Sequence, residues 1–173
     1  MNTKYNQRWY ALFVVTGEED RVKERICFII KGELKALVPK RRMRERKAGK
    51  WQERIRLLFP GYVLLKVHMN MRIYNLISAI PGVIRFLKNS DGPQDIDEEE
   101  IFVIQKLTSY NEIIEPSRVY MRGDKIEVID GPLLGMEGFI QSIDKRKGRV
   151  KVLLNLMGKP KTVELCVTMV QSA

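Results

Sequence analysis

Leu57-Leu58-Phe59-Pro60-Gly61-Tyr62-Val63-Leu64-Leu65 is an apolar run that is interrupted by a Pro-Gly pair with an aromatic residue on either side. Its last three residues form a continuous apolar segment, which is typical of a central strand buried on both faces. Proline and glycine interrupt backbone pairing, so Phe59 and Tyr62 can be turned outward at this point. Taken alone, the run has two interpretations: a bend packed inside a core, or a surface corner that carries aromatic side chains.

Positive charge is concentrated in two parts of the chain, which has 173 residues and a formal net charge of +10. Residues 40–56, directly before the apolar run, hold nine basic and two acidic side chains. Residues 145–161 hold seven basic side chains and no acidic one. A single basic stretch is usually a solvated face, but two such stretches favour a polyanionic partner. The charge distribution therefore predicts a nucleic-acid-binding protein.

The composition, 45% hydrophobic and 30% charged, is that of a globular protein. No apolar run approaches the roughly 18 residues of a membrane span. The polar residues 1–8 lead directly into an expected strand, which argues against a signal peptide. Cys27 and Cys166 have no metal-ligand spacing, and we expect two buried thiols in a reducing cytosol. These features predict a cytoplasmic protein with no membrane association, no metal and no cofactor.

Strand and helix patterns alternate from the start of the chain. Trp9–Val15 is an apolar, aromatic-rich run that predicts a buried strand. Thr16 and Glu19 have the spacing of a capping box, and Gly32 is placed to end the helix that they start. The apolar face of this helix is expected to comprise Val22, Ile26, Ile29 and Ile30.

The basic segment 40–56 reads as a hairpin with its turn at 48–50, and it leads back into the strand that precedes the Pro-Gly pair. Trp51 lies among its charged side chains. Two roles are open to this residue, stacking on a base or covering the sheet, and we favour the second.

Two more helices are expected after the Pro-Gly pair. Asn70 is a credible cap for the first, which Pro81-Gly82 stops before a short strand at 83–87. Its buried stripe should comprise Ile73, Leu76, Ile77 and Ile80. Asp97–Glu100 begins the second, and carboxylates there suit the positive end of the helix dipole, so this acidic run is not read as a catalytic or metal site. The second helix should bury Ile101, Ile104 and Leu107.

The pattern changes at residues 109–117, which have weak periodicity and are read as a linker. Beyond them, short strand-like segments alternate with glycine-containing turns, which indicates a small barrel of about five strands. The expected segments contain Ile126 and Val128; Phe139, Ile140 and Ile143; Val150, Val152 and Leu154; Val163 and Leu165; and Val167 and Met169. The chain is therefore predicted to be an α/β domain, residues 1–108, joined to an all-β domain, residues 118–173.

Taken in order, these segments resemble the NusG family of transcription elongation factors over nearly the whole chain. The N-terminal residues that carry the resemblance are Trp9-Tyr10, Phe59-Pro60-Gly61-Tyr62-Val63-Leu64 and Pro81-Gly82-Val83. The C-terminal residues look like a KOW motif: Gly123 to Val128, Asp130-Gly131-Pro132, Gly135 to Gly138 and Lys147 to Val152. The resemblance implies an NGN-type sandwich, with a mostly antiparallel central sheet and flanking helices, followed by an SH3-like KOW β-barrel.

The resemblance also implies a mechanism and a set of sites. In the family, the N-terminal domain docks an apolar patch onto the clamp helices of the largest RNA polymerase subunit, which suppresses pausing. The matching patch here is Phe13, Phe59 and Tyr62. Asn70 and Arg72 lie where relatives approach the non-template DNA strand. His68 is the only histidine and has no evident nucleophile or orienting partner beside it, so general-base catalysis has little support.

The chain departs from the housekeeping pattern of the family in its basic hairpin and its uniformly basic KOW segment. Contact with nascent RNA, in particular a structured leader, is the natural hypothesis for this KOW segment. The residues assigned to RNA are Lys145, Arg146, Lys147, Arg149, Lys151, Lys159 and Lys161. The chain thus resembles a specialised LoaP-type paralogue, a processive antitermination factor that we expect to be a monomer.

Three alternatives remain open at this stage. A housekeeping member would recruit a ribosomal protein or a termination factor through its KOW domain. A KOW-type ribonucleoprotein component would explain the basic barrel but not the Phe-Pro-Gly-Tyr corner. An enzyme, such as a nuclease using Asp124, Glu127 and Asp130, lacks an accompanying histidine or phosphate-binding loop. We therefore expect no enzymatic activity.

Overall fold

The computed structural model describes residues 6–32, 34–109 and 111–171. They form two compact units: Met1–Val38 with Phe59–Ile101, and Pro39–Leu58 with Phe102–Ala173. The basic hairpin therefore belongs to the same unit as the C-terminal strands. The partition into domains 1–108 and 118–173 with a linker at 109–117 stays a prediction. Among the described residues, no helix has the length and apolar character needed to cross a membrane.

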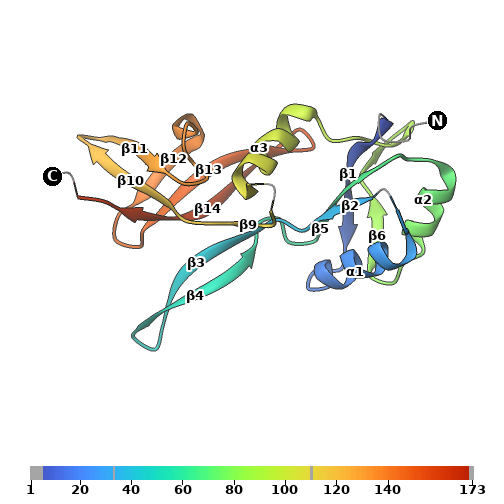
Figure 1. The fold of residues 1–173 in the computed structure, drawn as a ribbon, viewed down its shortest axis with the longest axis horizontal. Helices are drawn as coiled ribbons and strands as arrows, with labels where there is room; N and C mark the ends of the chain where they lie inside the picture. The colour runs from blue at the N-terminus through green and yellow to red at the C-terminus, as the bar shows by residue number, and fades with distance from the viewer. Residues whose placement is uncertain (1–5, 33, 110, 172–173) are drawn as a thin grey trace. The chain divides into compact units, whose positions relative to one another are not determined.

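Strand β1 (Arg8–Val14) lies inside a four-stranded antiparallel sheet of order β2-β5-β1-β6 (Figure 1). Its neighbours are β5 (Tyr62–Val67) and β6 (Val83–Phe86), and β2 (Lys35–Leu37) pairs with the far edge of β5. The run 63–65 is fully buried in β5, as its apolar sequence predicts. A strand enclosed on both faces needs apolar side chains on both, so this run fixes β5 as a central strand.

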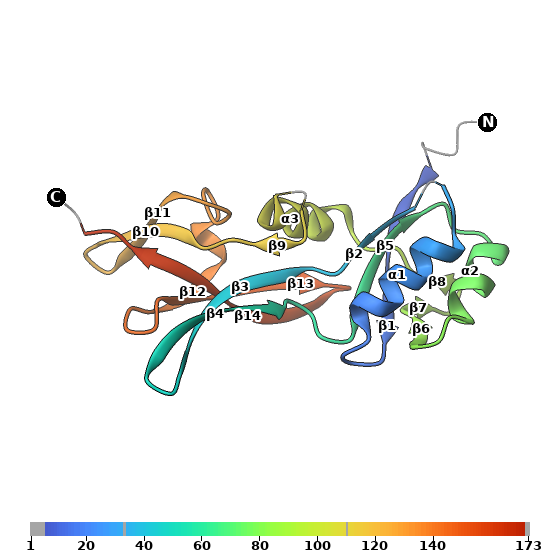
Figure 2. The same cartoon turned by 60° about the horizontal axis from the view of Figure 1, so that its bottom comes forward.

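Two helices pack against this sheet (Figure 2). Helix α1 (Glu19–Ile29) contacts β2 and β5, and helix α2 (Met71–Ser78) contacts β6. The predicted cap of α2 is confirmed, because Asn70 Oδ1 accepts a hydrogen bond from the Ile73 amide at 2.9 Å. A small pair of strands follows, β7 (Lys88–Asn89) and β8 (Gly92–Pro93). Helix α3 (Glu98–Thr108) starts with three glutamates and buries the three predicted apolar residues.

Three expectations about α1 are wrong, one of which is that Ile29 joins its buried face, because this residue is 43% exposed. The capping box does not form, because the helix begins only at Glu19 and Glu18, not Thr16, occupies the cap position, without a side-chain cap bond. Cys27 is exposed, whereas Cys166 is buried as predicted. Each helical residue is turned about 100° from the one before it, so the residue after the fully buried Ile26 points away from the core.

The second unit is built on a five-stranded sheet of order β11-β10-β14-β13-β12. Its strands are β10 (Ser117–Arg122), β11 (Lys125–Asp130), β12 (Ile140–Asp144), β13 (Arg149–Leu156) and β14 (Lys159–Met169), with a short 3-10 helix η2 (Glu137–Phe139) before β12. Inward-facing apolar residues alternate with exposed ones along β13. The predicted fold class, an α/β part followed by a small β domain, is confirmed.

The identity of the five strands differs from the prediction in two places. The segments at 163–165 and 167–169 belong to one strand, β14, in which Val163, Leu165 and Val167 are buried at alternate positions and Cys166 between them is buried as well. The fifth strand is β10, which pairs with β11 and runs parallel to β14. Its first residue, Ser117, falls at the end of the predicted linker.

The predicted basic hairpin is present as β3 (Lys40–Lys47) and β4 (Lys50–Leu57). Strand β9 (Ile113–Ile114), inside the predicted linker, pairs in parallel with β3 and completes a three-stranded sheet. Strand β3 also contacts β14 (Figure 2). The hairpin is therefore packed against the five-stranded sheet.

Candidate functional site

The Pro-Gly pair forms a tight turn that joins the hairpin to β5. The Tyr62 amide donates a hydrogen bond to the Phe59 carbonyl at 3.2 Å, and Gly61 has φ +84°. Proline second and a positive-φ glycine third is the sequence that a type II turn requires. The turn reverses the chain directly at the start of β5, so Phe59 and Tyr62 come to lie at its two ends.

A second Pro-Gly turn lies beside the first. The Val83 amide donates to the Ile80 carbonyl at 3.1 Å across Pro81-Gly82. The consecutive amides of Val14 and Val15, at the end of β1, donate to the carbonyls of Gly61 at 2.9 Å and Gly82 at 2.8 Å. Both turns are thus hydrogen-bonded to the end of β1, immediately after Phe13.

Glu19 stabilises the first turn through a buried hydrogen bond. The sequence alone did not reveal this role. The Glu19 side chain is only 2% exposed, and its carboxylate accepts hydrogen bonds from the amides of Gly61 at 3.1 Å and Gly17 at 3.0 Å. In a capping box, the Glu19 carboxylate would accept a hydrogen bond from a nearby backbone amide. The bond from the Gly17 amide is of this local kind. The bond to Gly61 spans 42 positions in the sequence, so only the fold brings the two groups together.

We expect Glu19→Ala to lower the free energy of unfolding by about 1–3 kcal/mol, because it leaves buried amides without an acceptor. Urea unfolding followed by circular dichroism measures the change. Glu24→Ala, at an exposed position of the same helix, is the matched control and should change stability by less than about 0.5 kcal/mol. Equal stability of the two variants would contradict the assigned role.

The three residues predicted to bind polymerase divide into two environments. Phe13 and Tyr62 lie opposite each other on β1 and β5, half-buried, with ring centroids 4.6 Å apart. Phe59 is only 3% exposed. Arg85 on β6 is the cross-strand neighbour of Phe13, and its guanidinium lies 5.1 Å from that ring. Two aromatic rings and an exposed arginine therefore form a row across three strands, which we call the aromatic row.

The aromatic row lies on the sheet face that α2 does not cover. Leu12 and Phe86 are cross-strand neighbours, and Phe86 stacks on Tyr74 of α2 with ring centroids 5.3 Å apart. Successive side chains of a strand point to opposite faces, so Phe13 points away from α2.

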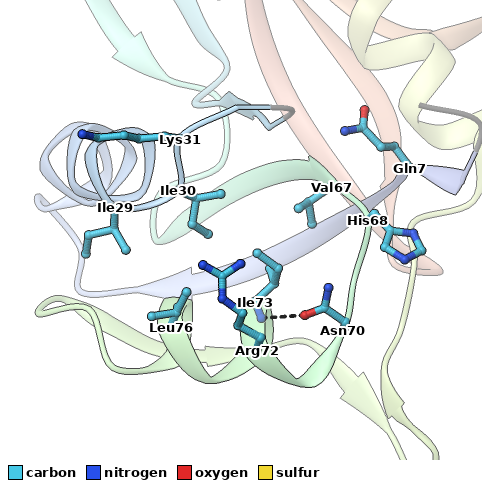
Figure 3. A pocket seen from close by; sticks show the side chains of 10 residues that line it. All are labelled: Gln7, Ile29, Ile30, Lys31, Val67, His68, Asn70, Arg72, Ile73 and Leu76. Atoms are coloured by element: carbon cyan, nitrogen blue, oxygen red, sulfur yellow. Dashed lines mark hydrogen bonds between the residues drawn. The ribbon is translucent and has the colours of Figure 1, made fainter. Parts of the chain in front are cut away.

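The two residues predicted to approach DNA lie together on a separate groove of about 470 Å³ in the first unit. Arg72 reaches over this groove from α2, whereas Asn70 uses its side-chain oxygen to cap the same helix (Figure 3). His68 lies at the edge of the groove in the same view. Of the two candidates, Arg72 has the exposed cationic group.

The seven basic residues predicted to bind RNA are spread along β13 and both of its turns. Residues 145–147 form the exposed turn before β13, and Lys151 is exposed in the middle of the strand. Lys159 and Lys161 follow the turn at the far end, where Lys159 pairs with Leu156. A strand rises about 3.3 Å per residue, so Lys159 lies roughly 23 Å from Arg149. The two basic turns therefore lie at opposite ends of β13.

Arg149 and Arg41 instead join the five-stranded sheet to hairpin β3–β4. Arg149 Nη2 donates to the Arg44 carbonyl at 3.1 Å, and Arg149 Nη1 lies 3.3 Å from the Glu164 carboxylate. Arg41 Nη1 donates to the Glu164 carbonyl. Burial lowers the pKa of Arg41, since it disfavours the charged guanidinium, although the nearby Glu164 carboxylate opposes this effect. This junction brings the two basic segments of the sequence together.

Two of the three acidic residues of the nuclease alternative, Glu127 and Asp130, are bonded to different arginines. Asp130 accepts a hydrogen bond from Arg118 Nε at 2.8 Å, which lowers the pKa of its carboxyl. The Glu127 carboxylate accepts a hydrogen bond from the Tyr120 hydroxyl, and its Oε1 lies 3.2 Å from Arg122 Nε. Within the described ranges, no three histidine, cysteine or acidic side chains are placed to hold a metal ion.

The chain is similar to known proteins along nearly its full length. Residues 7–105 match the family model "Transcription termination factor nusG". The "Transcription termination/antitermination protein NusG" of Buchnera aphidicola subsp. Baizongia pistaciae is 31% identical, over 95% of this chain and 96% of its own length. The protein of the same name from Vibrio cholerae is 31% identical over 95% of each. A solved structure, "Domain interaction in Thermotoga maritima NusG", superposes with a TM-score of 0.60 at 26% identity and covers 94% of each chain.

Proposed function

The chain belongs to the NusG family, and from this premise we propose that it is a non-enzymatic transcription elongation and processive antitermination factor that acts in the cytoplasm. Its first unit binds the clamp helices of the largest RNA polymerase subunit and suppresses pausing and termination. Its basic second unit contacts nascent RNA. The relatives are named for termination and antitermination, and this supports a role in transcription.

The observation that carries the polymerase contact is the aromatic row. Phe13 and Tyr62 present two half-buried rings side by side, next to a turn that two backbone hydrogen bonds and the Glu19 carboxylate hold in place. A preformed aromatic patch loses little side-chain entropy on binding, and aromatic anchors that fit a groove between helices are typical hot spots. Phe59, at the other end of the same turn, is buried in the core.

The groove that contains Arg72 supports a contact with non-template DNA. A guanidinium on an exposed helix surface attracts phosphates and can stack on an unpaired base. Asn70 fixes the start of α2 at this position, because its side-chain oxygen accepts a hydrogen bond from the Ile73 amide. Arg72 is therefore the contacting residue in this proposal and Asn70 the residue that positions it.

The basic second unit supports the specialised, LoaP-type function over a housekeeping one. Hairpin β3–β4 and the turn at 145–147 place many cations in one unit. Phosphate contacts supply most of the affinity of nucleic-acid-binding proteins and steer their association. In this proposal the second unit binds a structured leader RNA and thereby selects the operons on which the factor acts.

Single-round transcription by the homologous polymerase tests this function. The template carries a structured leader upstream of an intrinsic terminator, and a second template carries a scrambled leader. We expect the protein to shorten pauses and to raise read-through of the terminator on the first template, with a much smaller effect on the second. Equal effects on both templates would favour the housekeeping alternative, and the absence of any effect on pausing or read-through would overturn the proposal.

A further inference from the structure

A groove of about 340 Å³ lies where hairpin β3–β4 meets the five-stranded sheet. The hairpin contributes Arg44 and Trp51, and the sheet contributes the turn at 145–148 and the end of β14, residues 166–169. All four charged side chains that line it are basic: Arg44, Lys145, Arg146 and Lys147. A concave surface lined by one sign of charge concentrates the electric field and attracts polyanions.

The cations of the turn are available for an external anion. Among the residues that the structure describes, no carboxylate forms an ion pair with the side chain of Lys145, Arg146 or Lys147. The acidic residues of the hairpin are paired elsewhere: Glu45 lies 2.6 Å from Arg56 Nη2, and Glu53 lies 3.8 Å from Arg42 Nη1. Asp144 Oδ1 accepts a hydrogen bond from the Lys147 amide at 2.9 Å, so one carboxylate lies at the turn, but the charged side chains that line the groove are all basic.

Trp51 gives this groove an aromatic surface. The indole is 46% exposed, and the Arg44 guanidinium lies 5.7 Å from its ring centroid. Seven of the eight residues of β4 are exposed, so there is little core beneath the strand for Trp51 to cover. The expectation that Trp51 covers the sheet therefore loses its support. An exposed ring among cations is how proteins stack the bases of single-stranded nucleic acids.

We propose that this groove binds single-stranded RNA, with one unpaired base stacked on Trp51 and the flanking phosphates held by Arg44 and residues 145–147. The inference rests on the proposed RNA contact of the second unit and assigns it a site. Bases inside a duplex are already stacked, so only a loop, bulge or free end can reach the indole. A volume near the lower end of the roughly 300–1,000 Å³ of ligand pockets suits one nucleotide rather than a helix.

The indole itself provides the first test. The chain has two tryptophans, and Trp9 is buried in the sheet of the first unit. The full-length chain is titrated with a short mixed-sequence single-stranded RNA while tryptophan emission is recorded. We expect RNA to quench the emission and Trp51→Phe to abolish the quenching. Quenching that persists in Trp51→Phe would contradict the stacked arrangement.

Binding of the same RNA, labelled with fluorescein and followed by anisotropy, provides the second test. Trp51→Ala should weaken binding by about 5- to 150-fold, the range expected for loss of one base-aromatic stack, and Trp51→Phe should restore most of it. Ile55→Ala is the matched control, because Ile55 is an apolar side chain of similar exposure four residues further along β4. It should leave the affinity unchanged.

Salt dependence separates the phosphate contacts from the stack. Replacing Lys145, Arg146 and Lys147 together by glutamine should reduce the slope of log affinity against log salt by about two, since each phosphate contact on a single strand contributes about 0.7. Lys125→Gln, at an exposed lysine at the start of β11, should leave the slope unchanged. An unchanged slope in the triple variant would overturn the phosphate assignment.

The outcomes distinguish this site from the function on which it rests. If the wild-type chain binds no RNA, the proposed RNA contact itself fails. If it binds RNA and Trp51→Ala binds equally well, only the stacking site fails. Equal or tighter binding of single-stranded DNA of the same sequence would overturn the assignment to RNA. Tighter binding of the same RNA annealed to its complement would overturn the assignment to unpaired bases.

Discussion

A chain carrying Phe13→Ala and Tyr62→Ala should bind RNA polymerase about 30- to 1,000-fold more weakly than the wild type. Interface hot spots cost about 2–4 kcal/mol when truncated, and the two rings are in contact, so their effects should not simply add. The measurement is the dissociation constant for core polymerase, or for an isolated clamp-helix fragment, by biolayer interferometry. Both rings are half-buried, so we expect the sheet to persist.

The controls for this prediction come from the same unit. Phe28→Ala removes an aromatic side chain that is 77% exposed on α1, and it should bind polymerase like the wild type. Phe59→Ala is less informative, because removing a buried phenylalanine costs about 3–5 kcal/mol of stability and would confuse binding with unfolding. Undiminished binding by a double variant with a native circular dichroism spectrum would contradict the interface assignment.

Gly131→Ala should lower the stability of the second unit by about 2–5 kcal/mol. Gly131 has φ +99°, and a Cβ there would lie 2.7 Å from Ser117 Cα and 2.8 Å from Ser117 Oγ. The left-handed backbone costs about 1–2 kcal/mol for a residue with a side chain, and forcing apart a packed site adds about 1–3 kcal/mol. Ser117 begins β10, and its Oγ accepts a hydrogen bond from the Leu133 amide at 2.9 Å. A shift of Ser117 would therefore disturb both the strand pairing and this hydrogen bond.

Urea unfolding measures this loss, with Gly123→Ala as the matched control. Gly123 also has a positive φ, +64°, but a Cβ at this position would meet nothing within 4 Å. The control should therefore show only the backbone cost of about 1–2 kcal/mol. Equal destabilisation by the two substitutions would mean that the close approach to Ser117 carries no energetic weight.

The elements of the fold could be predicted wherever local sequence determines them. The apolar residues 63–65 indicated a central strand, Asn70 indicated a helix start, and the glycine turns indicated the C-terminal strands. Predictions failed where a distant residue decides the outcome. The Glu19 carboxylate accepts a hydrogen bond from the Gly61 amide and does not form a capping box with Thr16. No local sequence pattern encodes such a contact.

The candidate site was predictable in composition but not in arrangement. The sequence showed two basic segments, and only the contacts of Arg41 and Arg149 with Glu164 and the Arg44 carbonyl reveal that they meet. Those contacts span 123 and 105 positions in the chain. The sequence motif likewise grouped Phe59 with Tyr62, whereas the turn between them sends one ring into the core and the other to the surface.

The docking of hairpin β3–β4 on the C-terminal strands also has a consequence for synthesis of the protein. The hairpin leaves the ribosome roughly 100 residues before Glu164, which at about 5–20 residues per second is a delay of roughly 5–20 seconds. During this interval Arg41 lacks its partner Glu164 on β14, and the Arg44 carbonyl lacks its donor Arg149 on β13. Contacts of such high sequence separation also form slowly. We therefore expect the second unit to complete its folding only after β14 has left the ribosome, later than the sheet of the first unit.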